Sequence, residues 1–390
     1  MLDYNKILSD TVQHIQPSGI RKFFDLLNDK KDVISLTVGE PDFMTPWHIR
    51  DAAIESLQMG RTYYTSNDGI MELRSEICSY LNRRFGLSYA PKNEVIVTVG
   101  GSEAIDIAVR ALVNPGDEVI IPIPAFVCYG PIVELAHGVP VYIETKQEDN
   151  FKLTPEALRA AITDKTKLLV LPFPNNPTGA VLTREELERI AEVLRGTDIM
   201  VLSDEIYGEL TYGFKHTPIA TLDGMWERTV TVSGFSKAYA MTGWRLGYLC
   251  APAPLVTQMH KIHQYAIMCA PTTSQLAAIE ALKYGDPDIE MMSAEYNRRR
   301  KYILDGLHKI GIDCFEAEGA FYVFPYIGKF GLSSDEFCQR LLDEKGVAIV
   351  PGNAFGSCGE GFARISYAYS VEHITKALEA MGEFVAMLKK

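Results

Sequence analysis

The middle of the chain alternates short apolar segments, rich in β-branched residues, with longer amphipathic segments. The apolar segments predict seven β-strands, at residues 94–99, 118–121, 139–143, 167–171, 199–202, 229–232 and 246–250. Amphipathic helices are predicted between most of them, for example at residues 103–113 and 183–195. Strands that are apolar throughout and alternate with helices indicate a mostly parallel sheet that is covered on both faces.

The pattern changes after about Asp286. A long amphipathic stretch is followed by shorter elements, with helices predicted at residues 289–309, 334–344 and from 371, and strands at 321–325, 347–350 and 362–366. The N-terminal residues do not follow the alternation, and we expect them to pack on this second part. A chain of 390 residues usually forms more than one core.

The predicted fold is therefore α/β, with two domains. The large domain, residues 46–285, contains the mostly parallel seven-stranded sheet sandwiched by helices. The smaller domain is α+β and is formed by residues 1–45 and 286–390.

The composition narrows the classes of partner. The formal net charge is −12, and an acidic surface repels nucleic acid and anionic membranes, so we expect neither as a partner. The seven cysteines form no C-x-x-C pair, which indicates neither a disulfide framework nor a zinc site. The N-terminal residues lack an apolar signal segment, and no apolar run approaches the roughly 18 residues that span a bilayer. We expect a cytoplasmic protein.

Ligands of open α/β sheets bind at the carboxyl ends of the strands, so residues that follow predicted strands are the first candidates for a site. Lys237 lies shortly after the strand at 229–232, in the segment Ser-Gly-Phe-Ser-Lys-Ala-Tyr. Desolvation or neighbouring cations lower the pKa of a lysine amine, and the neutral amine forms a Schiff base with a carbonyl. The alternative is a solvated surface lysine.

Three polar residues follow the same logic. Arg245, in Thr-Gly-Trp-Arg-Leu-Gly, is suited to a bidentate contact with phosphate, although an internal ion pair is the alternative. Asp204 follows the strand at 199–202 and can pair with a protonated ring nitrogen, unless it is a helix N-cap. Tyr207, three residues further on, can donate to an oxygen of the same ring.

Other candidates lie after the remaining strands. The turn Gly100-Gly101-Ser102 precedes a helix and can bind an anion, but it has neither the G-x-G-x-x-G nor the P-loop pattern, and a plain tight turn is the alternative. Asn176 offers a polar contact or belongs to a turn, and Phe126 stacks on a flat ring or belongs to the core. Arg364, within an apolar strand, requires an anion, either a substrate carboxylate or an internal acid.

In this order and spacing, the motifs resemble the class I/II aminotransferases, which belong to fold type I of the pyridoxal-phosphate enzymes. The resemblance covers nearly the whole chain, from residues 18–21 and 39–43 to residues 362–366. Its most specific motifs are Asn-Pro-Thr-Gly at 176–179, Ser-Asp-Glu-Ile-Tyr at 203–207, and Ser-Lys at 236–237 with Thr-Gly-Trp-Arg-Leu-Gly at 242–247. The branch that it most resembles contains the aromatic-amino-acid and N-acetyl-diaminopimelate aminotransferases.

The resemblance implies a transaminase that moves an amino group from an amino acid to a 2-oxo acid, in a ping-pong reaction, through a Schiff base between Lys237 and pyridoxal 5′-phosphate (PLP). It implies catalytic roles for Lys237, Asp204 and Tyr207. The other residues implied to bind the cofactor are Gly101, Ser102, Phe126, Asn176, Ser236, Arg245 and Tyr64. Gly39, Asn176 and Arg364 are implied to bind the substrate. Tyr64 matches a tyrosine that reaches the phosphate in the partner subunit, which implies a homodimer with shared active sites.

Two positions depart from the family pattern. Phe126 stands where Trp or Tyr is frequent, so stacking is kept without a polar group. Gly234 stands where a phosphate-binding serine is often found, so Ser233 or Ser236 must substitute for it.

Because a fold does not fix a reaction, other classes stay open. They are a different PLP enzyme such as a C–S lyase, decarboxylase or cyclising synthase, an aminotransferase-like sensor, and a nicotinamide oxidoreductase. Arg364 argues against decarboxylation, because it would hold the carboxylate in place. As donors we expect aromatic or a broad range of neutral amino acids, with 2-oxoglutarate as acceptor. Aspartate or N-acetyl-diaminopimelate is the alternative, and Arg21 is the candidate for binding a distal carboxylate.

Overall fold

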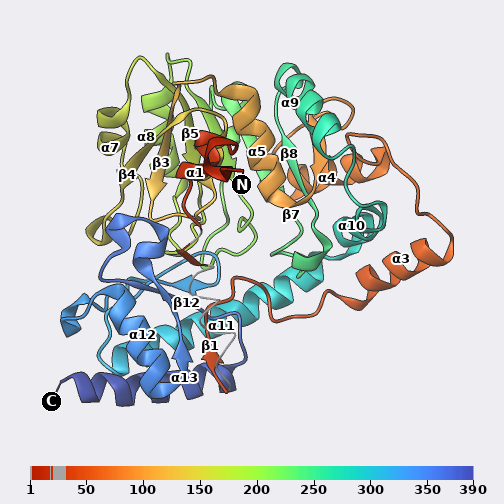
Figure 1. The fold of residues 1–390 in the computed structure, drawn as a ribbon. Coiled ribbons are helices and arrows are strands. Elements are labelled where there is room, and N and C mark those ends of the chain that lie inside the picture. Colours follow the sequence, from red (N-terminus) through yellow and green to blue (C-terminus); the bar gives the residue numbers. More distant parts are fainter. Residues whose placement is uncertain (1, 18, 21–31, 390) are drawn as a thin grey trace.

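The computed structural model describes residues 2–17, 19–20 and 32–389, and its centre is a seven-stranded sheet in the order β2-β8-β7-β6-β5-β3-β4 (Figure 1). The strands are β2 (Val95–Thr98), β3 (Glu118–Ile123), β4 (Val139–Glu144), β5 (Thr166–Leu171), β6 (Met200–Asp204), β7 (Thr229–Gly234) and β8 (Gly247–Cys250). Neighbouring strands are parallel, except that β8 runs antiparallel to both β2 and β7. The seven predicted strands and the mostly parallel sheet are confirmed.

Helices cover both faces of this sheet. One face packs on α5 (Gly100–Leu112), α6 (Tyr129–Leu135) and α9 (Ala253–Ala266). The other face packs on α7 (Pro155–Ala161) and α8 (Arg184–Leu194) at one end, and on α3 (Trp47–Gln58), α4 (Met71–Phe85) and α10 (Thr272–Tyr284) at the other. Strand β5 shows why its segment is apolar throughout: Leu168 and Val170 enter one core, whereas Leu169 and Leu171 enter the opposite one.

A second group of elements lies below the large sheet in Figure 1. Its helices are α11 (Asp286–Lys309), α12 (Ser334–Lys345) and α13 (Val371–Leu388), and its strands are β1 (Ile34–Ser35), β9 (Tyr322–Val323), β10 (Val347–Ala348), β11 (Val350–Pro351) and β12 (Ala363–Ser366). Apart from β11, whose Val350 packs with α7 and α8, they surround a core of their own, which also takes in Leu36. We propose, from this separate core, the division into the two domains given above.

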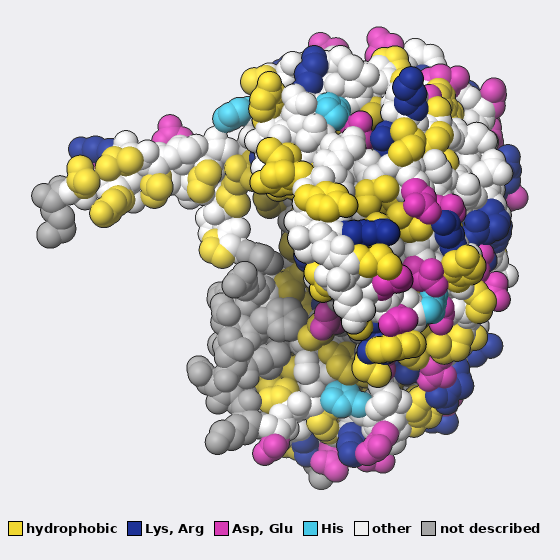
Figure 2. All heavy atoms as spheres, turned by 90° about the vertical axis from the view of Figure 1, so that its right-hand side faces the viewer, with side chains coloured by type: hydrophobic (Ala, Val, Ile, Leu, Met, Phe, Trp, Pro, Cys, Tyr) yellow, Lys and Arg dark blue, Asp and Glu magenta, His cyan; other side chains and the backbone are white. Residues whose placement is uncertain are grey.

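Two predictions for this second part differ from the structure. The predicted strand at 347–350 is two strands, because β10 pairs with β1 whereas β11 pairs with β12 in another small sheet. The N-terminal residues divide as well: β1 joins the smaller core as expected, but α1 (Asp10–His14) contacts α6 of the large part. Figure 2 shows the N-terminal arm, residues 2–17, standing off the body of the molecule with apolar side chains along it.

Local sequence explains the starts of two helices. Thr183 and Glu186 form a capping box at the start of α8, so that two otherwise unpaired backbone N–H groups are satisfied. Helix α5 begins at Gly100, earlier than predicted, so that Gly101 and Ser102 lie in its first turn, where backbone N–H groups have no acceptor within the helix. Across the described residues, no helix has the length and apolar character needed to cross a membrane.

Candidate active site

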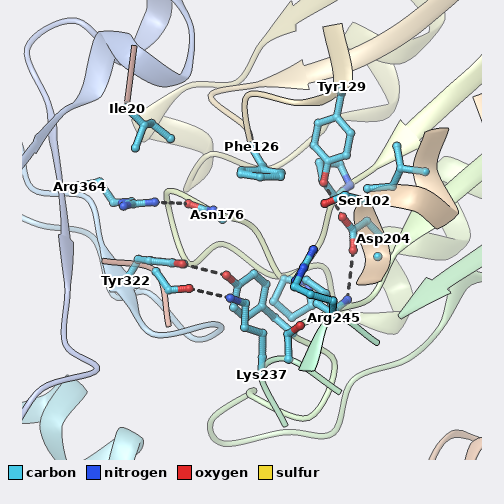
Figure 3. Close-up of a pocket in the computed structure, with 18 residues that line it drawn as sticks. Ile20, Ser102, Phe126, Tyr129, Asn176, Asp204, Lys237, Arg245, Tyr322 and Arg364 are labelled. Carbon is cyan, nitrogen blue, oxygen red and sulfur yellow. Dashed lines mark hydrogen bonds between the residues drawn. The ribbon is translucent and has the colours of Figure 1, made fainter. Parts of the chain in front are cut away.

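A cavity of about 350 Å³ lies at the carboxyl ends of β5, β6 and β7 (Figure 3). The structure brings eleven of the twelve predicted site residues to its wall: Gly39, Gly101, Ser102, Phe126, Asn176, Asp204, Tyr207, Ser236, Lys237, Arg245 and Arg364. Tyr64 is the exception, since its side chain is 78% exposed and it does not line the cavity. Arg21 lies outside the described residues, although the preceding residue, Ile20, lines the cavity.

Lys237 follows β7 and extends into the cavity (Figure 3). Its Nζ donates a hydrogen bond of 2.6 Å to the carbonyl oxygen of Gly39. Burial lowers the pKa of Lys237 to about 8; the charge of Glu40 opposes this, whereas Arg364 and Arg245 add to it. The neutral amine, which is the form that attacks a carbonyl, is therefore more populated near neutral pH than in an ordinary lysine.

Asp204, the last residue of β6, is a buried carboxylate at the floor of the cavity. One of its oxygens accepts a 2.7 Å hydrogen bond from the hydroxyl of Tyr129, and the other accepts from the backbone N–H of Ile206. Burial raises the pKa of Asp204, whereas these hydrogen bonds and the charge of Lys237 act in the opposite direction. A cationic ring nitrogen beside this carboxylate would offset its desolvation and keep it ionised.

The corner between α5 and the residues before β8 suits a phosphate. Gly100 has φ +76°, and a Cβ atom there would lie 2.8 Å from a terminal nitrogen of Arg245, so glycine lets the guanidinium reach the helix start. The unpaired N–H groups of the first turn and the arginine are both anion-binding groups. Of the two serines that were candidates to replace the usual serine, Ser236 lines the cavity, whereas the hydroxyl of Ser233 donates to the carbonyl of Glu205.

Arg364 of β12 is buried in the wall of the cavity, on the side opposite Ser102 and Asp204 (Figure 3). Its guanidinium donates to Oδ1 of Asn176 at 3.0 Å and to the carbonyl of Thr37, and it lies 4.7 Å and 4.9 Å from the ring centroids of Tyr322 and Phe355. Its Nε is buried without a hydrogen-bond partner. Both partners are neutral acceptors, so neither supplies the anion that a buried arginine requires. A substrate carboxylate would supply it.

Two tyrosines of the site were missed by the sequence analysis. Tyr129 holds Asp204, and its position three residues after Phe126 was a usable signal, since both lie on the segment that follows β3. Tyr322 lines the cavity, and its hydroxyl lies 2.8 Å from the hydroxyl of Tyr207. In the sequence, Tyr322 is one residue of a short apolar segment that predicts a strand, and nothing in that pattern indicates a functional site.

The chemistry of the donor set fits an anionic, carbonyl-bearing cofactor together with a carboxylate substrate. Lys237, Arg245 and Arg364 contribute three cations, and Asp204 contributes one anion, among the described residues of the wall. The chain as a whole has a formal net charge of −12, so the excess of positive charge is local to this cavity.

The α/β fold and the lysine of this cavity define a fold type I enzyme. The chain belongs to the aminotransferase class I and II family, whose model matches residues 31–381. It is therefore an aminotransferase that acts on amino acids and keto acids, and the family to which it belongs uses PLP. The resemblance seen in the sequence is confirmed.

Individual relatives cover almost the whole chain. A putative aminotransferase of Bacillus subtilis, YugH, is 54% identical, over 97% of this chain and 98% of the relative. An aspartate aminotransferase of Pyrococcus abyssi is 45% identical, over 96% of this chain and 97% of the relative. The crystal structure of an aromatic aminotransferase from Pyrococcus horikoshii matches with a TM-score of 0.90 and 44% identity, over 95% of this chain and 99% of that chain. Relatives of similar identity thus carry names with different substrates.

Proposed function

We propose that this enzyme is a transaminase that holds PLP as a Schiff base on Lys237 and transfers amino groups from aromatic or other neutral amino acids to 2-oxo acids such as 2-oxoglutarate. The observation that carries the proposal is the position of Lys237. Its amine, with a pKa lowered to about 8, shares one cavity with Asp204, Arg245 and Arg364. When bound, the cofactor supplies a carbon that takes up the amino group and a ring that withdraws electrons from the substrate.

The predicted site residues of the wall divide the binding of cofactor and substrate among them in this proposal. Asp204, held by Tyr129, keeps a proton on the ring nitrogen, and Tyr207 and Asn176 contact the ring oxygen. The first turn of α5 (Gly101 and Ser102), Ser236 and Arg245 hold the phosphate, and Phe126 stacks on the ring. Arg364 binds the α-carboxylate of the substrate beside Gly39.

Lys237 performs the proton transfer in this proposal. Once the substrate amine has displaced it, the freed Nζ removes a proton from the substrate Cα and would deliver it to the cofactor carbon that receives the amino group. Arg364 and Lys237 line the same cavity, so that binding the carboxylate fixes the orientation of Cα toward the amine. The two substrates use the same residues in turn, which predicts ping-pong kinetics.

The absorption spectrum of the purified protein tests this function. We expect a visible band from the bound cofactor that bleaches when an amino donor is added and returns with a keto acid. A panel of single amino acids ranks the donors in the same experiment. A visible band that no donor bleaches would favour a lyase or a sensor, and no band after addition of PLP would exclude the proposed cofactor.

The charges of the cavity support neutral donors. Among the described residues of the wall, each basic side chain already has a proposed role: Lys237 reacts with the cofactor carbonyl, Arg245 binds the phosphate and Arg364 binds the α-carboxylate. A distal carboxylate, as in aspartate or in the acceptor 2-oxoglutarate, needs a further donor, for which Arg21 stays the candidate. If phenylalanine and tyrosine prove poor donors while aspartate or N-acetyl-diaminopimelate is a good one, this assignment is wrong.

We further propose that the enzyme is a cytoplasmic homodimer in which Tyr64 of each subunit completes the site of the other. Tyr64 and Tyr63 are 78% and 69% exposed, although they belong to a loop that is hydrogen-bonded to α10 through Thr272. Large apolar side chains on the N-terminal arm are exposed as well: Leu2, Tyr4, Ile7, Leu8 and Val12. A second copy of the chain would cover such side chains and leave Tyr64 facing the neighbouring cavity.

Mixed dimers test the shared site. We expect Tyr64→Ala and Lys237→Ala each to be impaired as homodimers, because one loses a phosphate contact and the other loses the nucleophile. Equal mixing of unfolded subunits followed by refolding should give about a quarter of the wild-type activity, because half of the dimers then contain one unaltered site of two. The assay is run at a PLP concentration that leaves Tyr64→Ala sites mostly empty. No gain on mixing would place Tyr64 outside the partner's site.

A further inference from the structure

His263 lies in the interior of the molecule, between two segments of the proposed site. It belongs to α9, and its side chain is fully buried, at 0% exposure. Its Nδ1 lies 2.6 Å from a carboxylate oxygen of Glu103, and its Nε2 lies 2.9 Å from the backbone carbonyl oxygen of Asn67. The second carboxylate oxygen of Glu103 accepts a hydrogen bond from the backbone N–H of Val99.

These contacts determine the charge of the ring. A backbone carbonyl only accepts hydrogen bonds, and so does an ionised carboxylate. A neutral imidazole has one N–H and one bare nitrogen, so one of the two acceptors would face a lone pair. An imidazolium donates from both nitrogens, and it also pairs with the charge of Glu103.

The two acceptors belong to different parts of the site. Glu103 follows Gly101 and Ser102 in the first turn of α5, where the phosphate is proposed to bind. Asn67 belongs to the loop at residues 63–69, which carries Tyr64. The side-chain amide of Asn67 also donates to the carbonyl of Met268, just beyond the end of α9, at 2.7 Å. His263 thus contacts both the Tyr64 loop and the turn at the start of α5, and links the two through α9.

We propose that His263 is a positioning residue for the cofactor phosphate: as a buried imidazolium it fixes the Tyr64 loop to the first turn of α5 and neutralises the carboxylate of Glu103 beside the phosphate. The inference rests on the proposed PLP site. Without this cation, Glu103 would be a largely buried anion with no cationic partner in α9, close to the proposed phosphate, and Coulomb repulsion would weaken phosphate binding.

The surrounding charges agree with a protonated ring. Burial lowers the pKa of His263, but the hydrogen bond and charge of Glu103, the carbonyl of Asn67 and the charge of Asp68 outweigh it, so that the pKa is raised. Asp68 is itself paired with His260 of α9 and lies 3.8 Å from Arg74 of α4. Because the protonated form makes both contacts, they are complete at low pH and are lost as the pH rises through the raised pKa.

Nitrogen NMR of the histidine rings tests the charge in the wild-type holoenzyme. At about pH 7.5, where an exposed histidine is mostly neutral, we expect both nitrogens of His263 to be protonated. The signal is assigned by its absence in His263→Gln, and Glu103→Gln should convert it to the neutral form. A neutral ring in the wild type would overturn the proposal, whether or not PLP binds.

Binding of pyridoxamine 5′-phosphate to the cofactor-free full chain tests the link to the phosphate. This probe forms no Schiff base, so its affinity does not depend on the Lys237 amine. We expect His263→Gln to weaken binding about tenfold through the uncompensated charge of Glu103. The double variant Glu103→Gln/His263→Gln should regain most of the affinity, because it removes the unpaired carboxylate. His308→Gln, an exposed histidine of α11, is the control and should bind as the wild type does.

The outcomes are distinguishable. Wild-type affinity in His263→Gln would overturn the proposal, and so would a double variant as weak as the single one, because a packing defect is not rescued by removing a charge. If the wild type itself does not bind pyridoxamine 5′-phosphate, the proposed cofactor site is wrong. If His263→Gln unfolds, the signal is assigned by its change in Glu103→Gln instead, and the nitrogen NMR of the wild type then decides.

Discussion

Substitution of Lys237 by alanine is expected to lower the rate of transamination by at least about 10⁴-fold, because it removes both the nucleophile and the general base. The fold should be kept, because the lysine side chain extends into the cavity. The hydrogen bond that the substitution removes is the one from the amine to the carbonyl of Gly39. Non-covalent binding of PLP should persist as well, because the proposed contacts of Arg245 and Asp204 are unchanged.

Single-turnover kinetics with a saturating donor, together with circular dichroism, would measure these effects. A small primary amine added to the buffer should restore part of the rate, because it can fill the space left by the side chain and accept the proton. Lys261→Ala, at an exposed position of α9, is the matched control and should have wild-type activity. Undiminished turnover by Lys237→Ala would show that another group is the nucleophile.

Substitution of Arg364 by alanine is expected to reduce kcat/KM by about 10²- to 10³-fold for every amino acid alike. The basis is the loss of a buried, charge-assisted carboxylate contact of about 3–4 kcal/mol. The effect should fall mainly on KM, because the α-carboxylate is bound in the ground state and the transition state alike. It should be equally large for neutral and acidic donors, since all of them carry this carboxylate.

Kinetics with phenylalanine, alanine and aspartate as donors would test this role. Arg364→Lys should recover only part of the loss, because an ammonium group cannot make the bidentate contact and does not stack between Tyr322 and Phe355 as a planar guanidinium does. A change of KM confined to one donor would instead place Arg364 at the side-chain end of the cavity.

Much of the fold was predictable because the large sheet is buried on both faces. Its strands therefore appear in the sequence as continuous apolar runs. Val170 and Leu169, for example, are both apolar although their side chains enter cores on opposite faces of the sheet. The short strands of the smaller part gave less information. At residues 347–350, the change of partner from β1 to β12 depends on residues that are distant in the sequence, and no local pattern encodes it.

The site was predictable where chemistry constrains the residue type after a strand. Lys237, Asp204 and Asn176 are such residues, and the structure places them around one cavity. Tyr322 was missed because its strand comes from the other core, and only tertiary packing brings its hydroxyl to Tyr207. His263 gave no signal either, since a histidine within an amphipathic helix does not reveal that both ring nitrogens will face acceptors.

The reversed direction of β8 has a consequence for the proposed cofactor site. Gly234 at the end of β7 is paired with Gly247 at the start of β8, so Lys237 and Arg245 both lie in the single connection between two paired strands. The proposed attachment points of the cofactor carbonyl and phosphate therefore have a spacing that is set by contacts of low sequence separation, and such contacts form early in folding at a small cost in loop entropy. A displacement of the smaller core relative to the sheet would alter the position of Arg364, the proposed carboxylate ligand, without changing the distance between Lys237 and Arg245.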